Sequence, residues 1–139
     1  MYDHVLVATD GSEHAATAAT HAVDVAERYS ATLHALYVVE TRTAYDSAIL
    51  DAEEAEANLR DIGEEALEAV EQRSENRDLQ VISTIDSGIP AERILTYIDE
   101  NDIDFVFMGE RGRSAFKTVL LGSTAEGVLY ETDVPVALV

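Results

Sequence analysis

The residues best suited to chemistry lie in one stretch near the end of the chain, GERGRSAFKTVLLGST, at positions 109–124. Gly109 and Gly112 lack a Cβ atom, so their backbone can adopt positive φ and bring N–H groups close to an anion. Glycine-rich backbone of this kind is typical of loops that hold phosphate. The stretch therefore predicts a phosphate-binding loop.

The end of the same stretch adds a second anion-binding feature. Gly122, Ser123 and Thr124 lead into an expected helix, whose first N–H groups and dipole favour negative charge. Ser123 is followed three residues later by Glu126, which is the pattern of a capping box. The helix start and the glycines would then face the same anion.

Three basic side chains gather here although the chain as a whole is acidic. Its nine Lys and Arg stand against 28 Asp and Glu, which gives a formal net charge of −19. Arg111, Arg113 and Lys117 would locally offset the repulsion that this charge exerts on a polyphosphate. Asp10, in TDGS, would add to the repulsion unless it held a divalent cation or accepted a ribose hydroxyl.

Each of these residues also has a purely structural interpretation. The glycines can be ordinary turn residues, and the basic side chains can be solvated loop charges. Ser123 can be only a helix cap, and Asp10 can be a turn acid that accepts neighbouring backbone N–H groups. The sequence alone leaves these alternatives open.

The four histidines do not predict a metal site. His14 and His21 lie seven residues apart on an expected helix and could share a face, but no third ligand is evident. His4 and His34 each stand alone in strand-like segments. We expect both to be packed or hydrogen-bonded structural residues.

Hydrophobic periodicity predicts strands alternating with helices. The expected strands are 2–8, 32–39, 79–86, 104–109 and 134–139, and the expected helices are 13–29, 51–73, 91–100 and 123–132. Ser12 is placed to cap the first helix, and Gly88 and Pro90 mark a turn before the third. The interval 40–50 has no clean period.

Apolar strands separated by helices indicate a single α/β domain, residues 1–139, with a five-stranded parallel sheet covered on both faces. The common flavodoxin-like strand order, 3-2-1-4-5, would make the loops after the first and fourth strands neighbours. Ligands of such sheets bind beyond the carboxyl ends of the strands, where the strand order reverses. This rule selects the same two loops as the chemistry.

Composition narrows the class of protein further. The excess of acids argues against a nucleic-acid partner, and the single lysine suggests adaptation to high salt. Cysteine is absent, so thiolate metal sites and disulfides are excluded. No basic leader and no run of about 20 apolar residues is evident, so we expect a cytoplasmic protein that contacts no membrane.

Several nucleotide and hydrolase motifs are missing. The only lysine follows Phe116, which excludes a P-loop, and the first turn holds one glycine rather than a dinucleotide fingerprint. The expected fifth strand offers no lysine to pair with a phospho-aspartate, which argues against a receiver domain. No G-x-S-x-G elbow supports covalent hydrolysis.

The motif G-x2-G-x9-G-S-T, with VLVATDGS near the start and DVPVALV at the end, resembles the universal stress protein family in its ATP-binding branch. The likeness runs over the whole chain except 40–50. It implies a flavodoxin-like, adenine nucleotide alpha hydrolase-like fold and a homodimer joined through 134–139. With the acidic composition, it points to a halophilic archaeon. Ala115 stands where the family often has glycine, and Thr124 where it often has an aliphatic residue.

The resemblance also implies a role for each matching residue. Asp10 would contact the ribose or a metal-bridged phosphate, and the Val38 backbone would read adenine. The glycines of the loop would line the ribose and phosphates, and the start of the last helix would hold the phosphates. The implied binding residues are Asp10, Val38, Gly109, Gly112, Arg113, Gly122, Ser123 and Thr124.

These observations favour an ATP-binding stress-response module that could also take AMP or ADP, with Mg²⁺ or Mn²⁺. Its polar candidates for catalysis are Asp10, Ser123 and Thr124, so any hydrolysis should be slow. Nucleotide would order 110–122 and change a surface read by an unidentified protein partner or by the second subunit. The alternatives are a weak metal-dependent ATPase and a dimeric interaction module that binds no nucleotide.

Overall fold

The computed structural model describes residues 1–41, 52–111 and 121–139. The remaining positions, including Gly112, Arg113, Ala115 and Lys117, lie outside the described residues. The strands are β1 (His4–Ala8), β2 (Thr32–Glu40), β3 (Val81–Gly88), β4 (Phe105–Met108) and β5 (Val136–Leu138), and the helices are α1 (Glu13–Tyr29), α3 (Ala52–Ser74), α4 (Pro90–Glu100) and α5 (Ser123–Glu131).

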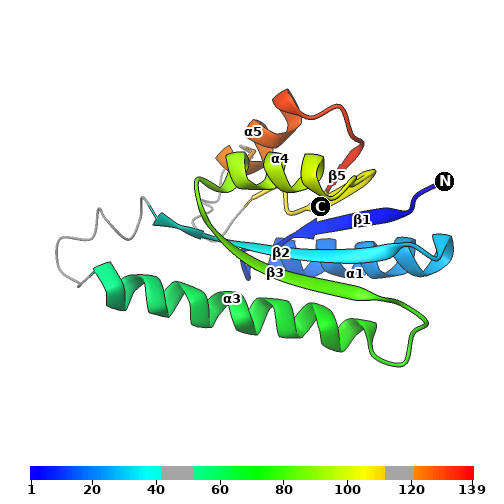
Figure 1. Cartoon of the computed structure of the whole chain (residues 1–139), viewed down its shortest axis with the longest axis horizontal. Coiled ribbons are helices and arrows are strands. Elements are labelled where there is room, and N and C mark those ends of the chain that lie inside the picture. The colour runs from blue at the N-terminus through cyan, green and yellow to red at the C-terminus, as the bar shows by residue number, and fades with distance from the viewer. Residues whose placement is uncertain (42–51, 112–120) are drawn as a thin grey trace.

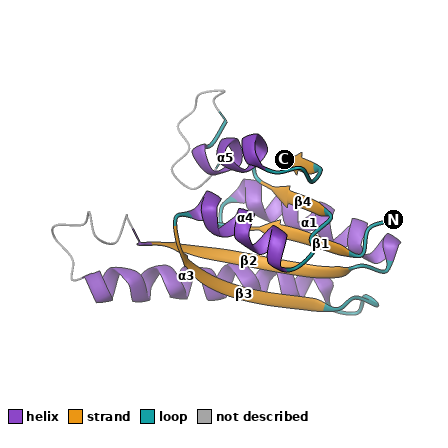
Figure 2. Ribbon diagram, turned by 45° about the horizontal axis from the view of Figure 1, so that its top comes forward, coloured by secondary structure: helices purple, strands orange, loops and turns teal. Residues whose placement is uncertain are grey.

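The five strands form one parallel sheet in the order β3-β2-β1-β4-β5 (Figure 1). Helices α1 and α3 cover one face of the sheet, and α4 and α5 cover the other (Figure 2). The predicted fold class and strand order are therefore confirmed. None of the helices in the described ranges combines the length and the apolar composition needed to cross a membrane.

The first helix shows why the sequence folds in this way. Its inner face consists of alanine and valine, so the helix can lie close to the sheet with its small side chains fully covered. The buried residues are Ala15, Ala18, Ala19, Ala22, Val23 and Ala26. Ser12 caps the helix as predicted, because its Oγ accepts the Ala15 N–H at 3.2 Å.

The register of the central strands sets the place of the site. Ala8, the last residue of β1, lies opposite Leu36 of β2 and opposite Met108, the last residue of β4. The chain leaves β1 toward β2 on one side and later returns to β4 on the other. The loops after β1 and β4 therefore meet at the point where the strand order reverses.

Several predicted boundaries differ by one or two residues from the observed ones, and one predicted helix cap was wrong. Strand β3 runs two residues later than expected, to Gly88, whose φ of 139° ends the strand. Strand β5 is shorter than 134–139. Helix α5 begins at Ser123 with Gly122 as its N-cap and no side-chain cap bond, so the expected capping box does not form. A serine inside the first turn is too far along the helix to cap it.

Candidate functional site

The turn after β1 lies at the carboxyl edge of the sheet. The Asp10 Oδ1 atom accepts the Ser12 N–H at 2.9 Å, and Gly11 adopts a φ of 82°. This is the turn role considered for Asp10. A carboxylate offers about four acceptor positions, so the turn bond does not by itself exclude contact with a ligand.

Gly109 follows β4 and packs directly against the start of α1. A Cβ atom added to it would lie 2.7 Å from the Cβ of His14 and 3.1 Å from the backbone nitrogen of Ala15. Its φ lies outside the left-handed region, so Gly109 does not use the positive φ that the missing Cβ would allow. The glycine is required because the loop touches the helix.

Backbone bonds of Glu110 join three chain segments at this edge. Its N–H donates to the carbonyl of Val139 at 2.9 Å, and its carbonyl accepts the N–H of Gly122 at 2.7 Å. The start of the glycine loop is therefore tied both to the end of β5 and to the N-cap of α5. At that helix start, Ser123 is exposed and Thr124 is half-buried.

Val38 lies beyond the end of β1 on the longer strand β2. Leu36 bonds toward β1, since the Thr9 N–H donates to the Leu36 carbonyl at 2.9 Å. Backbone groups two residues apart point to the same side of a strand, so those of Val38 point past the last residue of β1. The geometry places them at the same carboxyl edge as Asp10 and Gly109.

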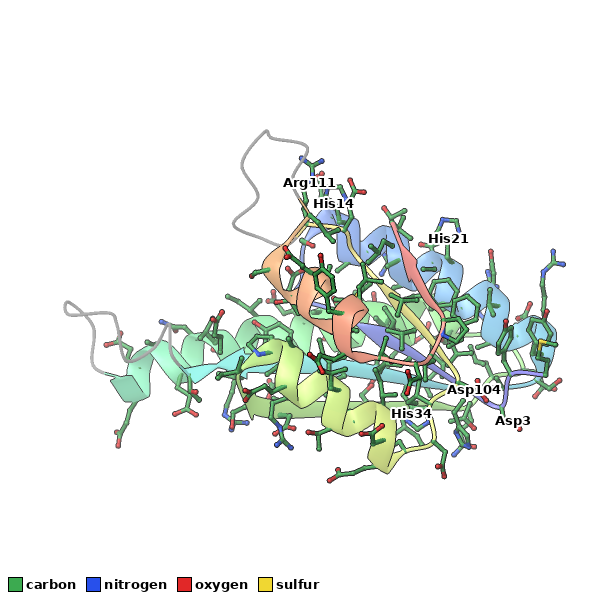
Figure 3. All side chains as sticks on the ribbon, turned by 90° about the horizontal axis from the view of Figure 1, so that it is seen from above. Asp3, His14, His21, His34, Asp104 and Arg111 are labelled. Atoms are coloured by element: carbon green, nitrogen blue, oxygen red, sulfur yellow. The ribbon has the colours of Figure 1, made fainter. Side chains whose placement is uncertain are left out.

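Arg111 extends this edge with a positive charge. Its Nη2 lies 3.3 Å from Nε2 of His14, and its Nε lies 3.9 Å from a carboxylate oxygen of Glu110. Figure 3 shows Arg111 and His14 side by side, whereas His21 lies farther along α1. His14 and His21 thus do not act as a pair.

Few of the described side chains at the carboxyl edge could bind a metal ion. Within the described ranges, no group of three or more His, Asp or Glu residues could hold a metal ion. A single carboxylate such as that of Asp10 suits contact with a water molecule of a phosphate-bound Mg²⁺ better than a full coordination sphere. The described donor set would therefore suit only a cation that is brought by a phosphate ligand.

The two remaining histidines pair at the opposite end of the sheet, where the His4 backbone nitrogen lies 3.4 Å from the Asp104 carboxylate oxygens and Figure 3 shows His34. Nδ1 of His4 lies 3.1 Å from Nε2 of His34, and Nδ1 of His34 lies 2.7 Å from the Tyr97 hydroxyl. The expectation that both are packed or hydrogen-bonded is confirmed. The β1–β2 register puts both on the face beneath α4, which makes them partners of each other.

Burial lowers the pKa of His34, and the neighbouring His4 lowers it further. Burial also raises the pKa of Tyr97, so its hydroxyl stays protonated. One ring N–H can be shared between the two histidines. If both rings were fully protonated, two N–H groups would face each other and the bond would be lost.

We expect this pair to make the protein less stable in acid. The native pKa of His34 lies below its ordinary value of 6.5, so the unfolded chain binds the proton more readily. The contribution of His34 to the free energy of unfolding is complete above that value. It falls by up to about 1.4 kcal/mol per pH unit as the pH drops below it.

Denaturant unfolding between about pH 8 and 5.5 measures this effect, in a range where most carboxylates stay ionised. His34→Gln should flatten the dependence, and His21→Gln, which removes an exposed imidazole from α1, should leave it unchanged. Equal slopes in the wild type and in His34→Gln would contradict the assignment.

Comparison with known proteins supports the fold described above. Residues 1–139 match the universal stress protein family along their whole length. The chain belongs to that family. Universal stress protein MJ0531 of Methanocaldococcus jannaschii is 29% identical over 140 residues, covering 100% of this chain and 82% of the relative. Universal stress protein YxiE of Bacillus subtilis is 27% identical over 147 residues, covering 100% and 99%.

Solved structures of universal stress proteins show the same fold. UspA from Lactobacillus plantarum superposes with a TM-score of 0.82 at 29% identity, covering 99% of this chain and 97% of that one. The structure of MJ0577 gives 0.81 at 30% identity, covering 100% and 96%. A universal stress protein in complex with cAMP gives 0.71 at 22% identity, covering 99% and 96%, which supports the fold alone.

For this universal stress protein, the structure brings together most of the predicted site. Asp10, Gly109 and the start of α5 meet at the carboxyl edge, and the Val38 backbone points to it. Gly112 and Arg113 lie outside the described residues. His14 was missed as a neighbour of the loop, because nothing in its spacing from Arg111 indicates their contact.

Proposed function

We propose that this protein binds an adenine nucleotide, with ATP as the preferred form, at the carboxyl edge between β1 and β4. The observation that carries the proposal is the junction at Gly109 and Glu110. There the loop after β4 touches the start of α1 and is bonded to the N-cap of α5. Two helix starts, both favourable to negative charge, are thereby held beside one loop.

Each end of the nucleotide would meet a different part of this edge. The Val38 backbone, pointing past β1, would bond to the adenine ring, and Asp10 would accept a ribose hydroxyl or a water of a phosphate-bound Mg²⁺ or Mn²⁺. Ser123 and Thr124 would donate to phosphate through hydroxyls and backbone N–H groups. The N–H of Gly122 already donates to Glu110, so Gly122 would contribute by letting the backbone pass close.

Gly112 and Arg113 stay predictions for the phosphate path, since they lie outside the described residues. We assign no described side chain at the edge as a base or nucleophile for the γ-phosphate, because the one imidazole described there, that of His14, contacts Arg111 and the Val139 main chain. We therefore propose binding with slow hydrolysis at most, in which nucleotide changes the loop and so the surface offered to a protein partner.

The homodimer through the last strand is part of the same proposal. Strand β5 lies at one edge of the sheet, so its outer backbone groups are available to a second copy. Leu129 and Tyr130 on the neighbouring α5 are exposed, and with Leu121 and Glu126 they line a groove that could widen such an interface.

We also propose a cytoplasmic location and, from the net charge of −19, a salt-rich cell.

Calorimetric titration with ATP and Mg²⁺ tests the proposal, in about 2 M KCl so that self-repulsion is screened. Asp10→Asn is the informative variant. The asparagine oxygen can still accept the Ser12 N–H, so the turn is kept while the charge is lost. We expect the affinity for ATP to fall about tenfold, as the stronger, charge-assisted bonds disappear.

The matched control is Asp99→Asn, which makes the same change at an exposed position near the end of α4. It should bind ATP as the wild type does, and NAD should bind to neither protein. A folded wild type that shows no heat of binding for ATP, ADP or AMP would reject the proposal. Equal affinities of wild type and Asp10→Asn would leave Asp10 as a turn residue only.

A further inference from the structure

His14 makes two polar contacts with segments that are remote in the sequence. It is the second residue of α1, and its Nε2 lies 3.3 Å from Nη2 of Arg111. Its Nδ1 lies 3.2 Å from the carbonyl oxygen of Val139. The ring thus lies between the loop after β4 and the end of the edge strand β5. Figure 3 shows it beside Arg111.

The two hydrogen-bond partners of His14 determine which of its ring nitrogens carries the proton. A guanidinium can only donate hydrogen bonds, so the Nε2 atom must accept. A carbonyl oxygen can only accept, so the Nδ1 atom must carry the proton. The neutral ring with its proton on Nδ1 satisfies both contacts at once, and no other form of the side chain does.

The second contact gives the ring a firm support. The Val139 carbonyl also accepts the Glu110 N–H at 2.9 Å, and the Val139 N–H donates to the Met108 carbonyl at 3.1 Å. The position of His14 is restricted further, because its Cβ lies close to Gly109. The acceptor offered to Arg111 is therefore held in place by the backbone of both strands that border the loop.

We propose that His14 is a positioning residue that holds the Arg111 guanidinium ready for a phosphate group of the bound nucleotide. This inference rests on the proposed function. Arginine suits phosphate because its planar fork donates two parallel bonds. A long side chain that is already held by a neighbour loses less conformational freedom when the ligand binds.

A double-mutant cycle on the affinity for Mg²⁺–ATP tests this role. Arg111→Ala should weaken binding about tenfold, because a charge-assisted contact is removed. His14→Phe keeps the ring size and should weaken binding about fivefold, the cost of ordering one long side chain. In the Arg111→Ala background, His14→Phe should have no further effect. A loss of packing alone would weaken binding equally in both backgrounds.

Two further variants sharpen the cycle. His14→Gln offers an amide oxygen to Arg111 and should recover part of the affinity, while His21→Phe changes a histidine of the same helix away from Arg111 and should bind as the wild type does. An equal effect of His14→Phe in both backgrounds, or none with Arg111 present, would overturn the positioning role alone. Failure of the folded wild type to bind ATP would overturn the proposed function and this inference together.

Discussion

Gly63→Ala is expected to lower the free energy of unfolding by about 2 kcal/mol, the typical cost of overpacking a buried contact. Gly63 lies within α3, over the Tyr37 ring of β2. A Cβ atom there would lie 2.5 Å from Cδ1 and 2.9 Å from Cγ of that ring. Tyr37 is only 4% exposed, so the ring has little room to move.

Whether Gly63→Ala destabilises or stabilises the protein shows which effect dominates at this position, the close contact with Tyr37 or the higher helix propensity of alanine. In a helix without such a contact, replacing glycine by alanine stabilises by about 1 kcal/mol. Denaturant unfolding followed by circular dichroism measures the difference, with Glu64→Ala on the exposed face of α3 as the control, expected to stay within about 0.5 kcal/mol of the wild type. A more stable Gly63→Ala variant would show that α3 does not rest on the Tyr37 ring.

Gly63 also shows what the sequence could and could not predict. The periodicity of 51–73 predicts the helix, because an amphipathic stripe persists through a single glycine. Nothing in that period says which ring the glycine faces. That contact depends on the position of α3 along the sheet, which is set by packing between elements far apart in the chain.

The same distinction runs through the site. The strand order and the edge at which ligands bind follow from apolar strands alternating with helices, so the turn at Asp10 and the loop at Gly109 were predicted as neighbours. The pairs His4–His34 and His14–Arg111 were not, because each needs a register or a side-chain direction that a short motif does not encode. A residue type at a given spacing predicts chemistry only where its own element fixes the geometry.

Gly109→Ala is the second large effect that we expect. Its new Cβ would press on the Cβ of His14 and on the backbone nitrogen of Ala15, atoms that cannot swing aside as the end of a flexible chain can. The first turn of α1 would have to move away from the loop. We expect a loss of about 2 kcal/mol in unfolding free energy and at least a tenfold loss in ATP affinity, because both sides of the site shift.

Asparagine variants distinguish two reasons why a position can require glycine, a close contact or a left-handed backbone. At Gly11, where φ is 82°, asparagine should be tolerated better than alanine, because its side chain can bond locally in the left-handed region. At Gly109 the order should reverse, since the larger side chain meets α1 more severely. Unfolding free energies of the four variants measure both orders. If asparagine were the milder change at Gly109, a left-handed backbone would be the requirement there, and the loop would reach a phosphate through its conformation rather than through its contact with α1.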